Sequence, residues 1–241
     1  MGSKHYLTGF TYKIGEFLRY LHYIMTTYLP LFPLQLVVFP GERLNLHIFE
    51  ERYKQLISEC FNGTKAFGIP SYINENVQEY GTEAEVSSIE KIYPDGRMDV
   101  SVKGLRTFRI IDFFAKADNA PYPAGMVSFE HDYIQHPINT LAEEGISKKL
   151  KEILTELSKV LDVSKNLIPS RPQNMSFSIA HYLGMPLEKE YELLLTTTET
   201  DRQRKLIQYI ESALPDIKKR ELMKTKIALN GHFKDIKPPE F

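Results

Sequence analysis

The chain has 241 residues, of which 42% are hydrophobic and 25% are charged, as in globular proteins of one large or two small domains. Its 30 basic and 31 acidic side chains give a net charge of −1, which argues against nucleic-acid binding through an overall positive field. The single cysteine, Cys60, excludes an internal disulfide and any multi-cysteine metal site, and no apolar run reaches the roughly 18 residues of a membrane helix.

Residues 1–27 read as an N-terminal extension. Their apolar residues have the spacing of a weakly amphipathic helix, but Glu16 and Arg19 interrupt the apolar stretch that a signal peptide requires. The alternative is that Met25 is the natural start, because the regular pattern begins just after it. With no signal peptide and no membrane segment, we expect a cytoplasmic protein.

Residues 28–131 read as a β-rich domain. Two turn signals, Phe39–Glu42 and Tyr93–Gly96, place Pro and Gly where tight turns need them, and Gly104 is expected to break a strand-like run. The expected strands cover residues 28–32, 36–39, 43–49, 64–70, 79–92, 97–102, 105–114 and 122–130. Short strands at this spacing predict a small β-barrel or sandwich.

One helix is expected inside this β half, over residues 50–62. Its apolar residues form a single stripe, in which Cys60 reads as a core residue, and Glu50 and Glu51 lie at the N-terminal end that favours carboxylates. The stripe contains Tyr53, Leu56, Ile57, Cys60 and Phe61. Gly63 is expected just past the end of the helix.

Residues 132–230 change to a helical period, and residues 231–241 form a tail. Capping boxes are expected at Thr140–Glu143 and Thr200–Gln203, a loop at 167–174 and a short helix at 175–183 before Gly184. Another short helix is expected to begin at Pro186. Pro215 is expected to end or kink its helix, with a last helix over 216–229. The whole chain is therefore predicted to be α+β, with an α-helical bundle after the β domain.

The sequence offers no recognised catalytic, cofactor or metal motif. It contains no phosphate-binding loop, no dinucleotide fingerprint, no G-x-S-x-G and no H-E-x-x-H. His131, Asp132 and His136 form the nearest approach to a cluster, without recognised ligand spacing. His47 reads as a surface histidine on the polar side of its strand. We expect no cofactor and no metal.

Several segments closely resemble the opening of the N-terminal, substrate-binding domain of Lon proteases. They are Leu29–Leu34, Val38–Glu42, Leu44–Tyr53, Phe67–Ile69, Tyr80–Val86, Pro94–Val100, Gly104–Ile110 and Pro121–Ala124. In the helical half the resemblance is looser and is carried by Ile179–Leu183, Leu193–Leu195 and Asp201–Arg202. It covers about residues 28–214.

This resemblance implies a PUA-like fold for the β half and a non-catalytic role. Lon proteases carry an ATPase module with a P-loop and a protease module with a Ser–Lys dyad, and this sequence contains neither. We therefore expect a stand-alone member that is not an enzyme. Its expected partners are unfolded polypeptides or partner proteins, with self-association as a further implication of the family.

Candidate contacts are the aromatic and charged residues at turns and loops. They are Phe39 at the Pro-Gly turn, Glu50, Glu51 and Arg52 at the start of the helix, and Tyr72 and Tyr80 around a loop expected at 71–80. Each has a structural interpretation as well, with Phe39 in the core and Glu50 to Arg52 forming a local ion pair and helix-end charges.

Two other functions stay open at this point. A PUA-like fold can host RNA contacts, and residues 97–109 supply Arg97, Lys103, Arg106 and Arg109. These side chains read equally well as an ordinary outer surface. A cryptic hydrolase would need a nucleophile and a base, for which the sequence identifies no pair.

Overall fold

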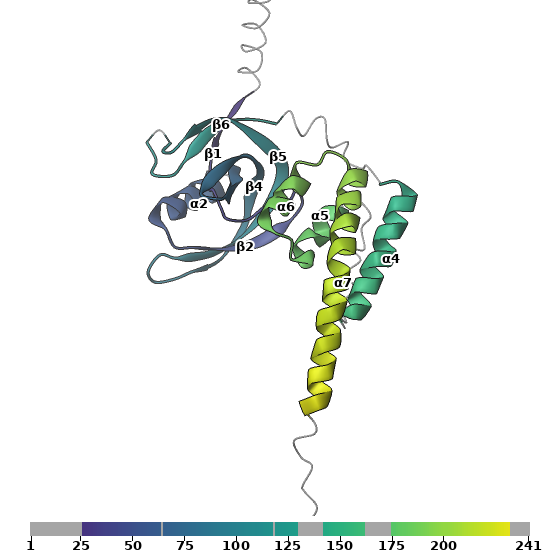
Figure 1. The fold of residues 1–241 in the computed structure, drawn as a ribbon. Helices are drawn as coiled ribbons and strands as arrows, with labels where there is room; N and C mark the ends of the chain where they lie inside the picture. The colour runs from purple at the N-terminus through teal and green to yellow at the C-terminus, as the bar shows by residue number, and fades with distance from the viewer. Residues whose placement is uncertain (1–25, 64, 118, 130–141, 162–174, 232–241) are drawn as a thin grey trace, which may run out of the picture. The chain divides into compact units, whose positions relative to one another are not determined.

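The protein divides into two compact units, with the division between residues 135 and 136 (Figure 1). This computed structural model describes residues 26–63, 65–117, 119–129, 142–161 and 175–231. The predictions for residues 1–25, for the cluster of His131, Asp132 and His136, for the loop at 167–174 and for residues 232–241 lie outside the described residues. Within the described ranges, no helix combines the length and the hydrophobicity that a bilayer span requires.

The β unit is a six-stranded antiparallel sheet built around one long strand, β5 (Met98–Phe114). The strands follow the order β1-β6-β5-β4-β3, and β2 also pairs with β5. One edge of β5 pairs with β4, and the other edge pairs with β2 and then with β6 along its length. The other strands are β1 (Thr27–Pro30), β2 (Arg43–Ile48), β3 (Phe67–Ile73), β4 (Asn76–Ile92) and β6 (Ala124–Ser128).

Residues that follow β1 close this sheet into a barrel. Leu31 and Leu34 form parallel bridges with Gly68 and Ser71 of β3, the strand at the opposite end of the sheet order. The amide of Phe32 donates to the carbonyl of Gly68 at 2.7 Å. The expected alternatives of barrel and sandwich are thereby decided in favour of a barrel, which removes most of the exposed sheet edges.

The embedded helix α2 (Glu51–Gly63) packs its apolar stripe on the barrel. The side chains of Tyr53, Leu56, Ile57 and Cys60 are buried in the main core cluster, as expected. Two details of the prediction were wrong. Phe61, assigned to the stripe, is exposed, because it lies at the margin of the buried face, and Gly63 is the last helical residue, without the positive φ of a left-handed cap.

Three further predictions in the β half were wrong. Residues 36–39 form no strand, although Leu36 is half-buried and Val37, Val38 and Phe39 are buried. Polar side chains bond their backbone instead: the hydroxyl of Thr82 donates to the carbonyl of Val38, and the carboxylate of Glu42 accepts from the amide of Phe39. The expected loop at 71–80 is a hairpin between β3 and β4, with positive φ at Asn74 and Glu75 in its two-residue turn.

The third concerns Gly104, which does not break its strand. β5 runs through it without interruption, at the point where pairing with β2 ends. Glycine is required here because the backbone of Phe39 approaches the strand closely. A Cβ built on Gly104 would lie 2.6 Å from the carbonyl oxygen of Phe39. The backbone of residues 41 and 42 also bonds to Gly104, at 3.0 and 2.9 Å. The buried segment therefore lies directly against the long strand.

The second unit is helical, as expected. It contains α4 (Glu144–Val160), α5 (Met175–Ala180), the 3-10 helix η1 (His181–Leu183), α6 (Leu187–Leu194) and α7 (Glu199–Gly231). The short helical segment ends at Gly184, which has the positive φ of a left-handed cap, as the sequence predicted. Pro186 is the residue before α6, so it precedes the helix by one position.

The expected helix starts in this unit were shifted. α4 begins at Glu144 after the cap residue Glu143, so the capping box predicted at Thr140 is wrong, and Thr140 itself lies outside the described residues. α7 begins at Glu199, one residue before the predicted cap Thr200, because the hydroxyl of Thr198 accepts from the amide of Asp201 at 3.1 Å.

Pro215 neither ends α7 nor separates it from a last helix. The helix continues through it to Gly231. Proline removes one backbone donor, and the carbonyl that loses its partner belongs to the turn at Glu211. Glu211 and Pro215 are both exposed, so water can bond that carbonyl at low cost.

A fully buried ion pair holds the helical unit together. Arg202 and Glu199 of α7 are both 0% exposed, and their side chains lie 3.0 Å apart. The Arg202 guanidinium also donates to the hydroxyl of Ser176 on α5 at 3.0 Å, while the Glu199 carboxylate accepts from the Ser176 amide at 2.9 Å. Gln203 donates to Glu199 and accepts from Ser147 of α4. The network therefore links three helices.

Gly104→Ala tests the close approach in the barrel. We expect the free energy of unfolding of the β unit to fall by about 1–3 kcal/mol, because the added methyl group meets a backbone oxygen that cannot rotate away. Urea unfolding followed by near-UV circular dichroism measures the change. The control is Gly63→Ala, whose Cβ meets only the flexible Lys65 side chain at 3.5 Å. Equal stability of G104A and wild type would contradict the geometry.

Glu199→Ala tests the buried ion pair. Removing the carboxylate leaves the Arg202 charge buried without its counter-ion, which costs about 3–5 kcal/mol in comparable sites. Glu192→Ala is the control, since its pair with Lys189 has the same i,i+3 spacing but is about half exposed. That control is expected to cost about 0.5 kcal/mol or less. Far-UV circular dichroism in urea reports both, and similar midpoints for the two variants would rule out the assigned role.

Candidate functional site

The first predicted contact residue, Phe39, is not available to a partner. Its side chain is 0% exposed and belongs to the interior of the barrel. The turn that follows it forms as expected, with Gly41 at a positive φ and the amide of Glu42 donating to the carbonyl of Phe39 at 3.1 Å. The prediction of Phe39 as a binding residue was therefore wrong, because the Pro-Gly turn points its first side chain inward.

The charged residues at the start of α2 form local pairs. The Arg52 guanidinium lies 2.7 Å from the Glu50 carboxylate, and the Lys54 ammonium lies 2.7 Å from Glu51. Arg52 also lies over the ring of Tyr53, at 4.5 Å from its centroid. These contacts agree with the structural interpretation of the three residues, since the charge of Arg52 is paired with Glu50 and the charge of Glu51 is paired with Lys54.

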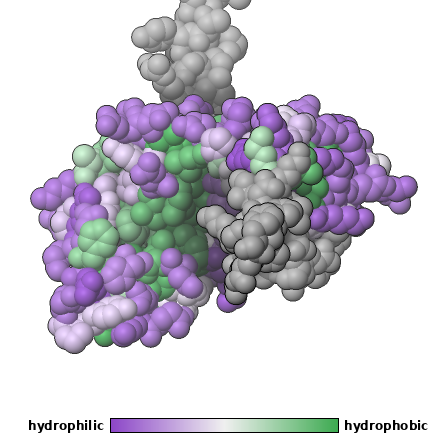
Figure 2. All heavy atoms as spheres, turned by 60° about the horizontal axis from the view of Figure 1, so that its bottom comes forward, coloured by the Kyte–Doolittle hydropathy of each residue, from purple (hydrophilic) through white to green (hydrophobic). Residues whose placement is uncertain are grey.

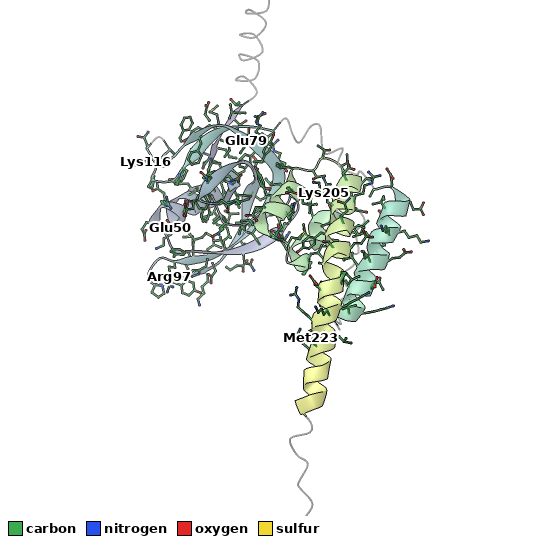
Figure 3. All side chains as sticks on the ribbon, viewed as in Figure 1. Glu50, Glu79, Arg97, Lys116, Lys205 and Met223 are labelled. Atoms are coloured by element: carbon green, nitrogen blue, oxygen red, sulfur yellow. The ribbon has the colours of Figure 1, made fainter. Side chains whose placement is uncertain are left out.

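Tyr72 and Tyr80 both belong to the β3–β4 hairpin. Tyr72 is 38% exposed and pairs with Val77, whereas Tyr80 is half-buried and pairs with Arg109 of β5. Figure 3 shows Glu79, the neighbour of Tyr80, well away from Glu50 at the start of α2. The fold thus does not bring the predicted contact residues together into one site.

The structure instead presents an apolar face that the sequence did not single out, formed across β2, β5 and β4. Val100 and Val102 of β5 are fully buried in its middle, and their register partners on both sides are only half-buried. These partners, here called the apolar face, are Leu44, Leu46, Val86 and Ile89. Figure 2 shows a band of hydrophobic side chains on the surface of the β unit, between hydrophilic margins.

The alternation of apolar and polar residues over 43–49 predicted part of the apolar face. It placed Leu44, Leu46 and Ile48 on one buried side, and Ile48 is indeed 1% exposed. Sequence alternation cannot tell a fully covered position from a half-covered one. The cross-strand register, which the sequence does not give, brings Val86 and Ile89 beside the leucines of β2.

A polar cluster lies on the opposite side of β2. The imidazole of His47 donates from Nδ1 to the carboxylate of Asp99 at 2.6 Å, and the hydroxyl of Tyr93 donates to the same carboxylate at 2.7 Å. These hydrogen bonds, chiefly the one from His47, hold the pKa of Asp99 below its usual range. His47 is thus the surface, hydrogen-bonded histidine that the sequence predicted.

The basic side chains of residues 97–109 each have an acidic neighbour. Arg97 pairs with Asp95 at 2.6 Å, Arg106 with Glu83 at 2.7 Å and Arg109 with Glu79 at 2.5 Å. Lys103 lies 4.0 Å from Glu85. Figure 3 shows Arg97 at the tip of the β4–β5 hairpin and Glu79 elsewhere on the unit, so these pairs are spread out and do not line one groove.

Cys60 is a core residue and not an activated nucleophile. Its side chain is 4% exposed, and burial raises the pKa of the thiol to about 11. Among the described residues, no group of three His, Cys, Asp or Glu side chains could hold a metal ion. The helical unit contains a cavity of about 240 Å³ among α4, η1 and α7, lined by apolar side chains such as Leu157 and Ile210, with Arg220 also in its lining.

Comparison with known families identifies the chain. Residues 28–212 match the model of the ATP-dependent protease La (LON) substrate-binding domain. The chain belongs to the Lon substrate-binding domain family. The resemblance found in the sequence is therefore confirmed, with nearly the same boundaries.

Lon relatives match at low identity. A Lon protease of Halothermothrix orenii is 24% identical over 202 residues, which are 76% of this chain and 24% of that protein. A LON peptidase N-terminal domain and RING finger protein of Schizosaccharomyces pombe is 33% identical over 108 residues, 37% of this chain and 22% of that protein. The chain thus spans about a quarter of the length of the curated relatives it matches.

Solved structures of Lon N-terminal domains have the same fold. A Lon N-terminal domain protein from Xanthomonas campestris aligns with a TM-score of 0.59 at 24% identity, covering 76% of this chain and 98% of that one. The N-terminal domain of a Mycobacterium avium complex Lon protease aligns with the same score at 14% identity, covering 77% and 98%. The α+β fold predicted from the sequence is thereby confirmed.

Because the pKa of the Cys60 thiol is raised, we expect this cysteine to react slowly with alkylating reagents in the native protein. At pH 8 a thiol of pKa about 11 is ionised roughly a hundredfold less than an ordinary thiol, so the native protein should alkylate at least that much more slowly than the urea-unfolded chain. Iodoacetamide labelling followed by mass spectrometry measures both rates. Comparable rates in the two states would show that Cys60 is exposed and ionised.

Proposed function

We propose that this protein is a non-catalytic module that recognises unfolded polypeptide clients or partner proteins through the apolar face of its β unit. Membership of the Lon substrate-binding domain family supports binding of protein substrates. The observation that carries the proposal is the apolar face itself. Leu44, Leu46, Val86 and Ile89 pack against the core and are themselves only partly buried.

The physical reason is the cost of leaving aliphatic surface in water. Each square ångström of apolar surface that a partner covers contributes about 25 cal/mol, so a few half-exposed leucines and isoleucines can hold an apolar segment with modest affinity. Unfolded chains expose such segments, whereas folded proteins bury most of theirs. An apolar face without charged groups of its own therefore favours unfolded clients.

The charge pattern supports a protein client over RNA. A surface that binds the RNA backbone needs unpaired basic groups along a groove. Here Arg97, Arg106 and Arg109 each lie within 2.7 Å of a carboxylate, so their charges are compensated before any partner arrives. An RNA would have to displace those carboxylates.

Leu46→Gln tests the apolar face. Replacing a half-exposed leucine by a polar side chain of similar size removes about 1 kcal/mol of apolar contact, so the affinity for reduced, carboxymethylated α-lactalbumin should fall roughly fivefold. Fluorescence anisotropy with the labelled, permanently unfolded probe measures the dissociation constant.

The matched control is Asn45→Gln, which places the same side chain on the outer side of the same strand. It should leave the affinity within twofold of the wild type. Native α-lactalbumin serves as a second control and should bind much more weakly than its unfolded form. The proposal fails if the wild type does not bind the unfolded probe, or if the two substitutions reduce binding equally.

A further inference from the structure

Strand β2 has one paired edge and one open edge. All six of its residues pair with β5, and in the part of the chain that the structure describes no other strand pairs with it. β2 runs along the lower border of the β unit in Figure 1. The barrel is closed by bridges between the segment after β1 and strand β3. These bridges do not involve β2, so its outer edge has no strand paired with it.

The backbone groups at this open edge can be assigned from the hydrogen-bond pattern. The amide of Gly104 donates to the carbonyl of Glu42 at 2.9 Å, immediately before β2. Hydrogen-bonded and non-hydrogen-bonded pairs alternate along an antiparallel ladder, so the next residues of β2 whose amides and carbonyls face β5 are Leu44 and Leu46. Arg43, Asn45 and His47 therefore direct their amides and carbonyls outward, where no described residue bonds them.

The chemistry of this edge specifies an extended polypeptide. It presents alternating donors and acceptors at a repeat of about 7 Å, which is the repeat of another β-strand. Open edges of this kind are usually blocked by proline or by charges that point inward. Here the central residue of the open edge is the uncharged Asn45, and all three outward residues have exposed side chains.

The charges at this edge favour an acidic partner over a second copy. Arg43 lies opposite Lys103 in the ladder, and no described carboxylate pairs with Arg43. An antiparallel copy centred on Asn45 would place Arg43 of one chain opposite His47 of the other. The carboxylate beside His47, Asp99, already accepts hydrogen bonds from His47 and Tyr93, so a second copy supplies Arg43 with no uncommitted counter-ion. An acidic side chain on an added strand would instead lie beside Arg43 and relieve its repulsion with Lys103.

We propose that the open edge of β2 binds an extended, net acidic polypeptide segment as an additional β-strand. This inference rests on the proposed function and specifies its mode of binding. The added strand extends the β2–β5–β4 sheet, so every second side chain of the client lies beside Leu44 and Leu46 on the apolar face. The recognised pattern is therefore alternating apolar side chains with a carboxylate near Arg43.

Asn45→Pro tests this strand addition, with Asn45→Thr as the matched control. Proline removes the outward amide of residue 45, and its ring blocks the edge, while the β2–β5 hydrogen bonds do not use that amide. Threonine removes the same side chain but keeps the amide. With reduced, carboxymethylated α-lactalbumin, which is acidic, the affinity should fall at least tenfold for N45P and stay within twofold for N45T.

Amide exchange of the wild-type full chain gives a second measurement that does not depend on the folding of a variant. Deuterium exchange at residues 43, 45 and 47 should slow at least tenfold when the same probe is added. Unchanged exchange there, or wild-type affinity of folded N45P, overturns the strand addition. If strand addition is overturned but the L46Q variant still binds the probe more weakly than the wild type does, the proposed function stands without strand addition. If the wild type binds no probe, both fail.

Discussion

The architecture of the β unit depends on the continuity of one strand. β5 must offer one edge to β4 and divide the other between β2 and β6, so any interruption would separate the two ends of the barrel. The division falls near Gly104, where the buried segment of residues 36–42 crosses against the strand. Only a residue without a side chain allows the carbonyl of Phe39 to approach that closely. Glycine at this position therefore keeps the strand whole.

That constraint explains where sequence reasoning succeeded and where it failed. The alternation of 43–49, the stripe of α2 and the turns at Phe39–Glu42 and Tyr93–Gly96 are local patterns. Each formed as expected, apart from the exposed Phe61 at the margin of the stripe. Gly104 and Pro215 were interpreted as breaks, because local propensity disfavours both residues inside an element. Tertiary contact at Gly104 and solvent exposure at Pro215 outweigh that propensity. The sequence contains neither kind of information.

The candidate site was harder to predict for a related reason. Phe39, Glu50, Glu51, Arg52, Tyr72 and Tyr80 were chosen for exposure at turns and helix ends, but exposure depends on which strands become neighbours. The apolar face exists only because the register places Val86 and Ile89 on one side of β5 and Leu44 and Leu46 on the other. Long-range register is the property that a single sequence specifies least directly.

The pairing of β1 with β6 limits how the β unit can be divided. Thr27 lies opposite Val127, about a hundred residues later in the chain, and Leu31 then crosses to Gly68. The strands that meet at this seam come from the two ends of the domain, so neither end is a dispensable appendage. A fragment that lacks residues 27–34 would lose the ladder with β6 and the bridges to β3 together, and one that lacks residues 124–128 would lose the ladders of β6 with both β1 and β5. The segment from Thr27 to Ser128 is thus joined at its two ends by the β1–β6 ladder.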